Sequence, residues 1–530
     1  MTTVEDVRAV IPNADPEVVK KVLALKKKAW PYSFKAERDL VALRAKLETL
    51  FQPGEKGNAP DSKSTKRYKI AGRLASKRGS GGIAFLDVEG QDGKLQAILD
   101  KSEMGDAAFD EALHLLNVGD WVGVAGYGMR SKRGEPSLGA EKVTLLAKSL
   151  VPMVDLRSAD NPELRYGKPY IGLMQGPAAR KVLVSRARIT QVVRQTLEKE
   201  GFLDVAIPVL EKVYGGANAK PFTTKSNAKE MTMYLRISHE LALKKLLVGG
   251  LERVYHVGPA FRNEDIDTTH NPEFTLMECY AAYWDYTGMM RLTEKLFQKA
   301  VAAINGGSLQ LKVGGAPDGT GATLLDFANF QTITMKEAIR LHSADTPEAV
   351  AWWTEHNKAP EGAGLSPGLD VDEMSDEEMQ AILAKHNVVI RGGWARGLGI
   401  AKLFEVFAEA KLIQPTFVID HPKETTPLCK AHRKDPTLVE RFELFIAGRE
   451  HANSYSELND PYAQAKAFQD QEARRTAGDD EAPPTDQDFI DALSHGMPPA
   501  GGLGIGIDRM VMTLLGVDSI KQVLPFPQMK

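Results

Sequence analysis

Residues 251–286, LERVYHVGPAFRNEDIDTTHNPEFTLMECYAAYWDY, carry the most informative pattern in the chain. The apolar run Val254–Val257 predicts a strand, which ends at 261–264 (FRNE) with a cation and a carboxylate. A polar loop follows at 265–270, and a second strand begins at 271–274. The stretch therefore predicts an antiparallel hairpin with a charged loop.

The second strand of this hairpin has a mixed face. Its period of two places four residues on one side: Phe274, Leu276, Glu278 and Tyr280. Such a face is a poor candidate for plain core, because a buried carboxylate without a partner is costly. A nucleotide site fits better, since Arg262 can fork onto a phosphate and Phe274 can lie flat on a base. The alternative is an ordinary hairpin with a salt-bridged Arg.

The strings FRNE at 261–264 and HNPEFTLME at 270–278 closely resemble motif 2 of the class II aminoacyl-tRNA synthetases, in particular the lysyl-tRNA synthetases. The resemblance implies that Arg262 is catalytic and bridges the amino-acid carboxylate and the α-phosphate of ATP. It also implies a set of ATP-binding residues around it: Glu264, His270, Asn271 and Phe274.

A second motif lies at 500–509, AGGLGIGIDR, which predicts a glycine-rich strand running into a helix. It lacks the GxGxxG order and the GxxxxGK[ST] pattern, so Rossmann and P-loop sites are excluded. It resembles class II motif 3, in which Arg509 stacks on adenine and pairs with phosphate, as a second catalytic residue. The HIGH and KMSKS strings of class I synthetases are absent.

Two carboxylates near the end of the chain are candidate metal ligands. Glu443 and Glu450 carry the hard oxygens that hold Mg²⁺ against phosphates, although either can instead be a salt-bridge partner. Residues 442–460 resemble the lysyl enzymes' FExFxxGxExxNxxxELND segment. His451 stands where the family usually has an aliphatic residue, either as a surface substitution or as a group that tunes nearby charge.

The resemblance also implies a lysine pocket. Its residues are Gly216, Glu240, Arg262, Glu278, Tyr280, Asn453, Tyr455 and Glu457. Glu240 would hold the α-amino group, and Glu278 with Glu457 would form an acidic end for the side-chain ammonium. A site built to pair a charge strongly rejects analogues that lack it. An aspartyl enzyme needs cations at this place, so the set favours lysine.

Residues 179–208 contain a long amphipathic helix, with Gly201 as its C-terminal cap, and then a strand at 202–207 that stops at Pro208. This unit resembles class II motif 1, which builds the dimer interface in the family, so we expect a homodimer. The chain has Ala206-Ile207-Pro208 where the family commonly has Glu-Thr-Pro.

Residues 66–148 predict an OB-fold barrel of five short strands, with a helix at 106–116. Such barrels stack single-stranded bases on aromatic side chains in a basic groove. Phe85 is the best candidate for stacking, although in isolation a core position is the commoner role. The segment resembles the anticodon-binding domain of lysyl-tRNA synthetases, and four residues match its anticodon-reading positions: Arg78, Phe85, Gln96 and Glu135.

Composition fits this organisation. A chain of 530 residues is too long for a single hydrophobic core, so more than one domain is expected. Its content of 43% hydrophobic and 26% charged residues is typical of a globular protein. Residues 1–150 contain 25 Lys and Arg against 20 Asp and Glu, which is compatible with a nucleic-acid-binding module or with a solvated surface. Two cysteines exclude a disulfide framework. We find no secretory signal and no apolar run of about 18 residues, so a cytoplasmic protein without membrane spans is expected.

We thus expect an α+β protein with four parts: N-terminal helices and a linker (1–65), the OB-fold (66–148), an interdomain linker (149–178) and a class II catalytic domain on a mainly antiparallel sheet flanked by helices (179–530). Segment 300–400 is assigned no chemistry. The implied function is Mg²⁺-assisted ligation of L-lysine to tRNA(Lys) with ATP. The alternatives are an aspartyl or asparaginyl synthetase, a non-catalytic RNA-binding paralogue and a protein-lysylating paralogue.

Overall fold

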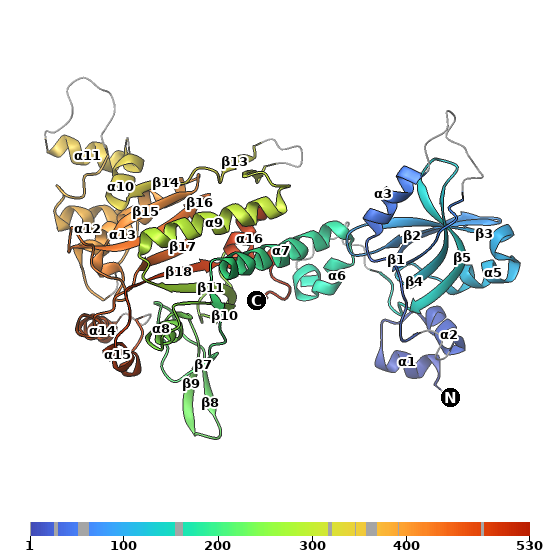
Figure 1. The fold of residues 1–530 in the computed structure, drawn as a ribbon, viewed down its shortest axis with the longest axis horizontal. Coiled ribbons are helices and arrows are strands. Elements are labelled where there is room, and N and C mark those ends of the chain that lie inside the picture. The colour runs from blue at the N-terminus through green and yellow to red at the C-terminus, as the bar shows by residue number, and fades with distance from the viewer. Residues whose placement is uncertain are drawn as a thin grey trace. The chain divides into compact units, whose positions relative to one another are not determined.

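The computed structural model describes residues 2–25, 30–50, 63–153, 163–315, 321–344, 346–356, 368–390, 392–478 and 482–529. They form two compact units, Met1–Val182 and Leu183–Lys530 (Figure 1). No helix among the described residues is long and apolar enough to cross a membrane.

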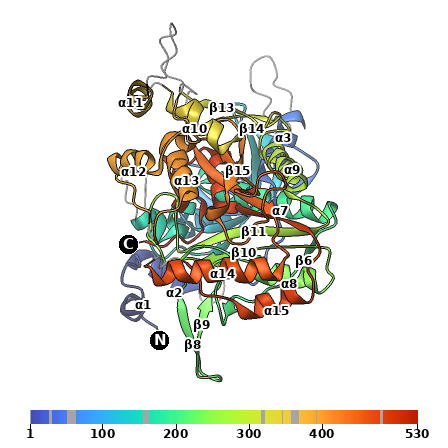
Figure 2. The same ribbon diagram turned by 90° about the vertical axis from the view of Figure 1, so that its left-hand side faces the viewer.

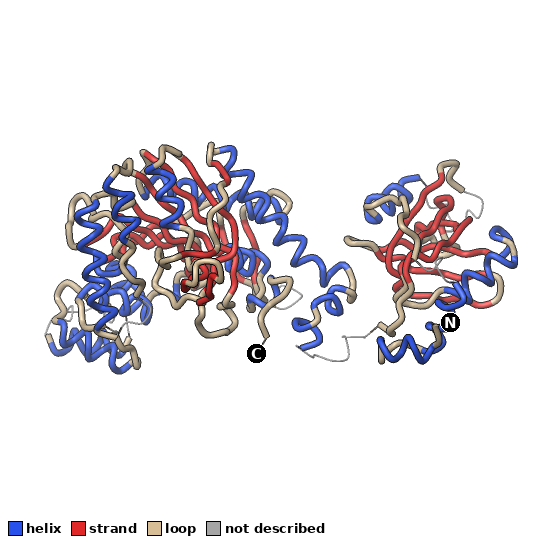
Figure 3. Tube along the Cα trace, turned by 90° about the horizontal axis from the view of Figure 1, so that it is seen from below, coloured by secondary structure: helices blue, strands red, loops and turns tan. Residues whose placement is uncertain are grey.

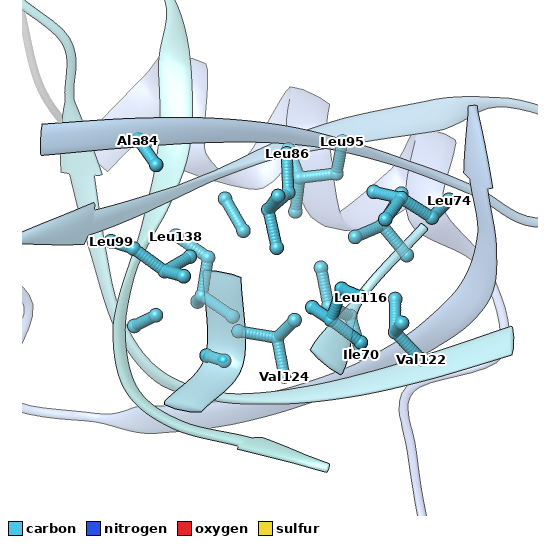
Figure 4. Packing of buried hydrophobic residues seen from close by; sticks show 14 of the residues in the cluster. Ile70, Leu74, Ala84, Leu86, Leu95, Leu99, Leu116, Val122, Val124 and Leu138 are labelled. Atoms are coloured by element: carbon cyan, nitrogen blue, oxygen red, sulfur yellow. The ribbon is translucent and has the colours of Figure 1, made fainter. Parts of the chain in front are cut away.

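The first unit is built on a closed five-stranded barrel, with strand order β1-β2-β3-β5-β4. The strands are β1 (Arg67–Ser80), β2 (Ile83–Glu89), β3 (Lys94–Asp100), β4 (Trp121–Arg130) and β5 (Pro136–Ala147). Alternate residues point inward and fill the barrel, as the buried side chains in Figure 4 show. Helices α4 (Lys101–Met104) and α5 (Asp106–Leu115) lie between β3 and β4 in the chain, which confirms the predicted OB layout.

Three N-terminal helices precede the barrel: α1 (Val4–Val10), α2 (Pro16–Leu25) and α3 (Leu40–Leu50). Leu40, Leu43 and Leu47 of α3 are buried in the barrel cluster, as their helical spacing predicts. A π-helix, η2 (Glu163–Gly167), and α6 (Pro169–Leu173) follow the barrel. The linker expected at the end of segment 1–65 lies outside the described residues as far as residue 62.

The second unit is organised on an eight-stranded sheet, in the order β14-β15-β16-β17-β18-β11-β10-β6. The strands are β6 (Leu203–Asp204), β10 (Arg253–Phe261), β11 (Glu273–Ala282), β14 (Gln331–Thr334), β15 (Thr416–Pro422), β16 (Leu438–Ile446), β17 (Arg449–Ser456) and β18 (Ala500–Gly506). Only the two edge strands pair in parallel, so the prediction of a mainly antiparallel sheet is confirmed.

Helix α7 (Pro177–Lys199) ends as predicted at Gly201, whose φ of +83° lets the Phe202 amide return to the Leu197 carbonyl. The strand predicted at 202–207 is wrong in length, because β6 covers only Leu203–Asp204. Side chains take the carbonyls beyond it: His256 contacts the Val205 oxygen, and Arg236 donates to those of Ile207 and Pro208. Within the described residues, 205–208 therefore belong to no strand of a sheet.

Helices cover both sides of the sheet, as the tube in Figure 3 shows. α9 (Tyr286–Ile304) runs along β16, β17 and β18 (Figure 1). α8 (Glu240–Val248) packs on β11, and α15 (Gln487–Ser494) packs on both α8 and α14 (Pro461–Thr476), as Figure 2 shows. α16 (Ile507–Leu515) follows β18, and α17 (Ile520–Val523) contacts it.

Segment 300–400 adds β14 to the main sheet and forms a helical layer with its own hydrophobic core. The layer contains α10 (Met335–Ser343), α11 (Pro347–Glu355), α12 (Asp376–Lys385) and α13 (Arg396–Phe407). Thr334 and Glu337 form a capping box that starts α10. The smaller sheets are β12-β13 (Gln310–Val313, Thr323–Asp326) and β7-β9-β8 (Leu210–Glu211, Met231–Leu235, Thr223–Ser226).

Candidate active site

A cavity of about 440 Å³ lies in the second unit, against β11, β16, β17 and β18. Its volume is in the range of small-ligand sites. It gathers every site residue predicted for the catalytic domain: Gly216, Glu240, Arg262, Glu264, His270, Asn271, Phe274, Glu278, Tyr280, Glu443, Glu450, Asn453, Tyr455, Glu457 and Arg509. The structure therefore brings together residues that lie up to 293 positions apart in the chain.

Side chains alternate between the two faces of β11 and of β18, and this alternation shapes the cavity. The predicted face of β11 lines it, and the adjacent strand β18 supplies Gly502 opposite Tyr280 and Gly504 opposite Glu278. A Cβ at Gly502 would lie 2.0 Å from Glu457 Oε1 and 2.5 Å from Tyr280 Cε1, so only glycine leaves these side chains in place. A Cβ at Gly501 would instead face Asp285 and Met289, on the side that α9 covers.

One end of the cavity is acidic, as predicted. Glu278 accepts hydrogen bonds from Ser238 Oγ (3.1 Å), the His239 amide (3.0 Å) and Tyr280 Oη (2.9 Å). Burial, together with the charge of Glu240, raises the pKa of Glu278 to about 7. Glu457 is fully buried; Lys244 contacts its Oε2, and its Oε1 accepts no hydrogen bond from the described residues. Both carboxylates are therefore poised to pair with a cation.

The wall beside this acidic end is aromatic. Tyr455 Oη donates to both oxygens of Glu240 at 2.7 Å, and the ring of Tyr280 lies next to Gly502. Gly216 has a φ of +85°, and a Cβ there would lie 2.5 Å from Ser238 Oγ. The loop that carries Gly216 therefore needs glycine to approach the start of α8.

The other end of the cavity is cationic. The Arg262 guanidinium lies 5.2 Å from the Phe274 ring centre, and its buried Nε has no hydrogen-bond partner among the described residues. Arg509 Nη2 donates to His270 Nε2 at 3.1 Å, and His270 Nδ1 lies 2.8 Å from Asp267. A buried guanidinium with an unused donor fits an anionic ligand.

The loop residues of the predicted ATP set lie around this cationic end. Glu264 is exposed, and its negative charge faces Arg262. The Asn271 side chain donates to the Glu273 carbonyl at 2.6 Å and accepts from the Gln528 amide at 3.2 Å. Asn271 therefore holds the start of β11 and ties it to the end of the chain.

Glu443 and Glu450 line the cavity from neighbouring strands, and Glu450 Oε2 lies 3.7 Å from Arg509 Nη1 of the cationic end. Burial and the charge of Glu443 raise the pKa of Glu450, and a bound cation relieves such repulsion. Glu443 also pairs with Arg441 at 2.5 Å. No cluster of three or more His, Cys, Asp or Glu ligands exists among the described residues. Two hard oxygen donors therefore fit Mg²⁺ that completes its shell with phosphate and water.

His451 is not a surface substitution, which was one of the two readings of the sequence. It is buried, and its ring nitrogens lie 2.7 Å from the Arg449 carbonyl and 2.7 Å from Thr513 Oγ1 of α16. Burial lowers its pKa to about 4, so the ring is neutral near pH 7. His451 therefore joins β17 to α16.

Two further residues of this site, Arg441 and Lys244, were not predicted from the sequence. Arg441 donates to Asn453 Oδ1 and Thr425 Oγ1, both at 3.0 Å, and so orients Asn453. Lys244 contacts Glu240 and Glu457 from within α8. The spacing of four between Glu240 and Lys244 was a signal for a helical ion pair, but such pairs usually lie on exposed faces.

Of the predicted anticodon residues, Arg78 is exposed, Phe85 and Glu135 are partly exposed, and Gln96 is buried. Arg78 is opposite Phe85 in the pairing of β1 with β2, and Phe85 is half-buried between the inward-pointing Ala84 and Leu86. Phe85 is thus not a core residue. Gln96 Nε2 donates to Glu135 Oε2 at 3.3 Å. The Arg78 side chain pairs with Asp87 at 3.2 Å, so the structure joins Gln96 to Glu135 by a hydrogen bond and places Arg78 opposite Phe85 only in strand register.

Comparisons with known proteins agree with this geometry. Residues 161–530 match the family described as tRNA synthetases class II (D, K and N), and residues 68–146 match an OB-fold nucleic acid binding domain. A lysine–tRNA ligase of Sulfolobus acidocaldarius is 42% identical over 477 residues, which cover 90% of this chain and 89% of that protein. Lysine–tRNA ligases of Halalkalibacterium halodurans (42% identical, covering 88% and 87%) and Methanoculleus marisnigri (40% identical, covering 94% and 91%) are similar along comparable lengths.

Proposed function

This chain belongs to the class II tRNA synthetases, and we propose that within the family it is a lysine–tRNA ligase, which activates L-lysine with ATP and transfers it to the 3′ end of tRNA(Lys). The observation that carries the choice of lysine is the acidic end of the cavity. Glu278 and Glu457 are buried there with no arginine in contact among the described residues, and Lys244 contacts only one oxygen of Glu457, so the two acids suit an ammonium group. An aspartyl or asparaginyl enzyme would have to place a carboxylate or an amide against these two acids.

The residues that line the cavity also offer a partner for each part of this substrate. Glu240 at the start of α8 would pair with the α-amino group, while Arg262 and Asn453 would hold the carboxylate. The aliphatic stem would lie along Tyr455 and Tyr280, with its terminal ammonium at Glu278 and Glu457. Each charged group of lysine then meets an opposite charge or a hydrogen-bond partner.

In the first chemical step, a carboxylate oxygen of lysine attacks the α-phosphorus of ATP, and the bond to pyrophosphate breaks. No protein nucleophile takes part. Arg262 would hold both reacting anions in contact, with Phe274 stacked on the adenine, so orientation and charge neutralisation provide the catalysis. Arg509 and His270 would hold the outer phosphates. Mg²⁺ on Glu443 and Glu450 would neutralise phosphate charge.

In the second step, a hydroxyl group of the terminal ribose of tRNA attacks the lysyl carbonyl carbon, and AMP leaves. The barrel of the first unit would read the anticodon, with Phe85 stacking on a base and Arg78, Gln96 and Glu135 contacting base edges. Gln96 and Glu135 already form a hydrogen-bonded pair, and Ser137 Oγ donates to Gln96 Oε1 at 3.0 Å.

A homodimer is part of this proposal. Two apolar side chains of the motif 1 segment are exposed in the single chain: Val184 of α7 is 39% exposed, and Leu203 of the edge strand β6 is 53% exposed. An unpaired edge strand beside exposed apolar residues is typical of a surface that a second subunit covers.

ATP–pyrophosphate exchange tests the function, with lysine, aspartate, asparagine and ornithine offered separately. Exchange with lysine alone is expected. Exchange with aspartate or asparagine would contradict the pocket assignment, and no exchange in a protein that still binds tRNA would favour the non-catalytic alternative. Arg262→Ala should abolish exchange while tRNA binding is retained, because Arg262 lies in the second unit and the anticodon face in the first.

A further inference from the structure

Lys244 of α8 is an unusual group to find beside a pocket for ammonium. Its side chain is fully buried, donates to Glu240 Oε1 at 2.5 Å and forms an ion pair with Glu457 Oε2. Three aromatic rings surround its Nζ at 5.5–5.9 Å, those of Tyr280, Tyr455 and Phe489. Burial opposes its charge, yet Glu240 and Glu457 hold the pKa of Lys244 above its usual value. The ammonium is therefore charged in the folded protein.

Packing alone does not explain a lysine at this position. The surroundings are a hydrophobic cluster that includes Leu241, Leu247 and Phe489. A buried ion pair contributes little net stability compared with apolar side chains of similar volume. A methionine would fill the same space, so the charge of Lys244 requires another reason.

The charges at this end of the pocket provide one. Three buried carboxylates meet there: Glu240, Glu278 and Glu457. With Lys244 they leave two negative charges when all are ionised. We propose that Lys244 is the fixed counter-ion of these three pocket carboxylates and sets their net charge to match the two ammonium groups of a diamino acid. The inference rests on the function proposed above and names the device by which this chain selects a dication.

The two carboxylate oxygens of Glu457 have different contacts. Oε2 is the atom that contacts Lys244, whereas Oε1 faces Gly502 and accepts no hydrogen bond from the described residues. Lys244 thus acts as a positioning residue, which fixes Glu457 through one oxygen and leaves the other for the substrate. Burial and the charges of Glu240 and Glu278 raise the pKa of Glu457, and Lys244 opposes that rise.

The other groups that face Glu457 cannot replace Lys244. Tyr280 on β11 and Tyr455 on β17 are neutral phenols, since burial raises both of their pKa values well above the ordinary range. The thiol of Cys429, which bridges to Glu457 through the backbone, is held neutral by burial, which raises its pKa. Lys244 is therefore the cation that contacts Glu457 within the described residues.

The test compares Lys244→Met, Glu457→Gln and the double variant with the wild type, by KM for lysine in pyrophosphate exchange. Lys244→Met leaves three carboxylates without a counter-ion and removes the cation that lowers the pKa of Glu457, so KM should rise at least about tenfold near pH 7 and fall as the pH is raised. The KM for ATP should stay unchanged.

The double variant separates this role from a merely structural one. Glu457→Gln leaves one net negative charge, and adding Lys244→Met restores two. Removing Lys244 should therefore cost nothing in the Glu457→Gln background, whereas a structural lysine costs the same in both backgrounds. An equal cost in both, or a Lys244→Met enzyme with the wild-type KM, overturns the proposal.

Two controls complete the experiment. Lys244→Arg keeps the charge and should keep the wild-type dependence of KM on pH; if Lys244→Met does not fold, a KM of Lys244→Arg that falls more steeply with rising pH than that of the wild type overturns the proposal. A wild-type protein without lysine-dependent exchange would refute the proposed function and this inference together. Wild-type exchange with an unaffected Lys244→Met would refute the inference alone.

Discussion

Gly502→Ala is predicted to damage the lysine end of the pocket selectively. The new methyl group would lie 2.0 Å from Glu457 Oε1 and 2.5 Å from Tyr280 Cε1, and both side chains are almost fully buried. Neither can move into solvent, so the strand or the pocket must shift. Overpacking of this kind costs about 1–3 kcal/mol. If the lysine-bound geometry bears that cost, KM for lysine rises about 5- to 150-fold.

The assay is pyrophosphate exchange with lysine and ATP varied in turn, together with a thermal melt. KM for ATP should change little, because Phe274 and Arg509 lie at the other end of the cavity. Gly504→Ala is the matched control for packing, on the same strand and face, since its Cβ would meet nothing nearer than 3.7 Å. It should melt like the wild type, whereas Gly502→Ala should melt a few degrees lower. A Gly502→Ala enzyme with normal KM and melting temperature would refute the packing argument.

Three further predictions concern charge, metal and the buried histidine. Because burial raises the pKa of Glu278 to about 7, its carboxylate is protonated below that pH, and KM for lysine should climb toward about tenfold per pH unit as the pH falls; a flat KM from about pH 6 to 7.5 would contradict this. Chelation of divalent cations should stop exchange, and Glu450→Gln should raise the Mg²⁺ concentration for half-maximal rate at least about tenfold, while an unchanged requirement would remove Glu450 from the metal site. His451→Leu leaves the Thr513 hydroxyl without its ring partner, so thermal melting should show a loss of about 1–3 kcal/mol with normal exchange, and a large loss of activity would place His451 in the chemistry.

Much of this site was predictable because strands impose a strict period. Once β11 was recognised in the sequence, Phe274, Glu278 and Tyr280 had to share a face. The glycine-rich run at 500–509 likewise predicted a strand running into a helix, and β18 followed by α16 confirms it. The OB barrel and the class II family assignment, with lysine as the amino acid of the relatives, are confirmed by the comparisons.

The remaining features depend on contacts between distant segments. Strand β6 is short because His256 and Arg236, which follow it by about fifty and thirty residues, take the carbonyls beyond it. Arg441 acts by donating to Asn453 of the neighbouring strand. In the sequence, nothing distinguishes it from an ordinary surface arginine. Lys244 could be placed on a helix, but its burial against Glu457 follows only from the fold.

Selection of the substrate by its terminal ammonium, through the two buried acids Glu278 and Glu457, can be tested with a single ratio. The measurement is kcat/KM in pyrophosphate exchange for lysine against 6-hydroxynorleucine, which has the same stem and a hydroxyl in place of the ammonium. A site built to pair a buried charge should prefer lysine by at least about 10⁴-fold. A preference of about tenfold or less would mean that Glu278 and Glu457 do not contact the end of the side chain, and it would contradict the account.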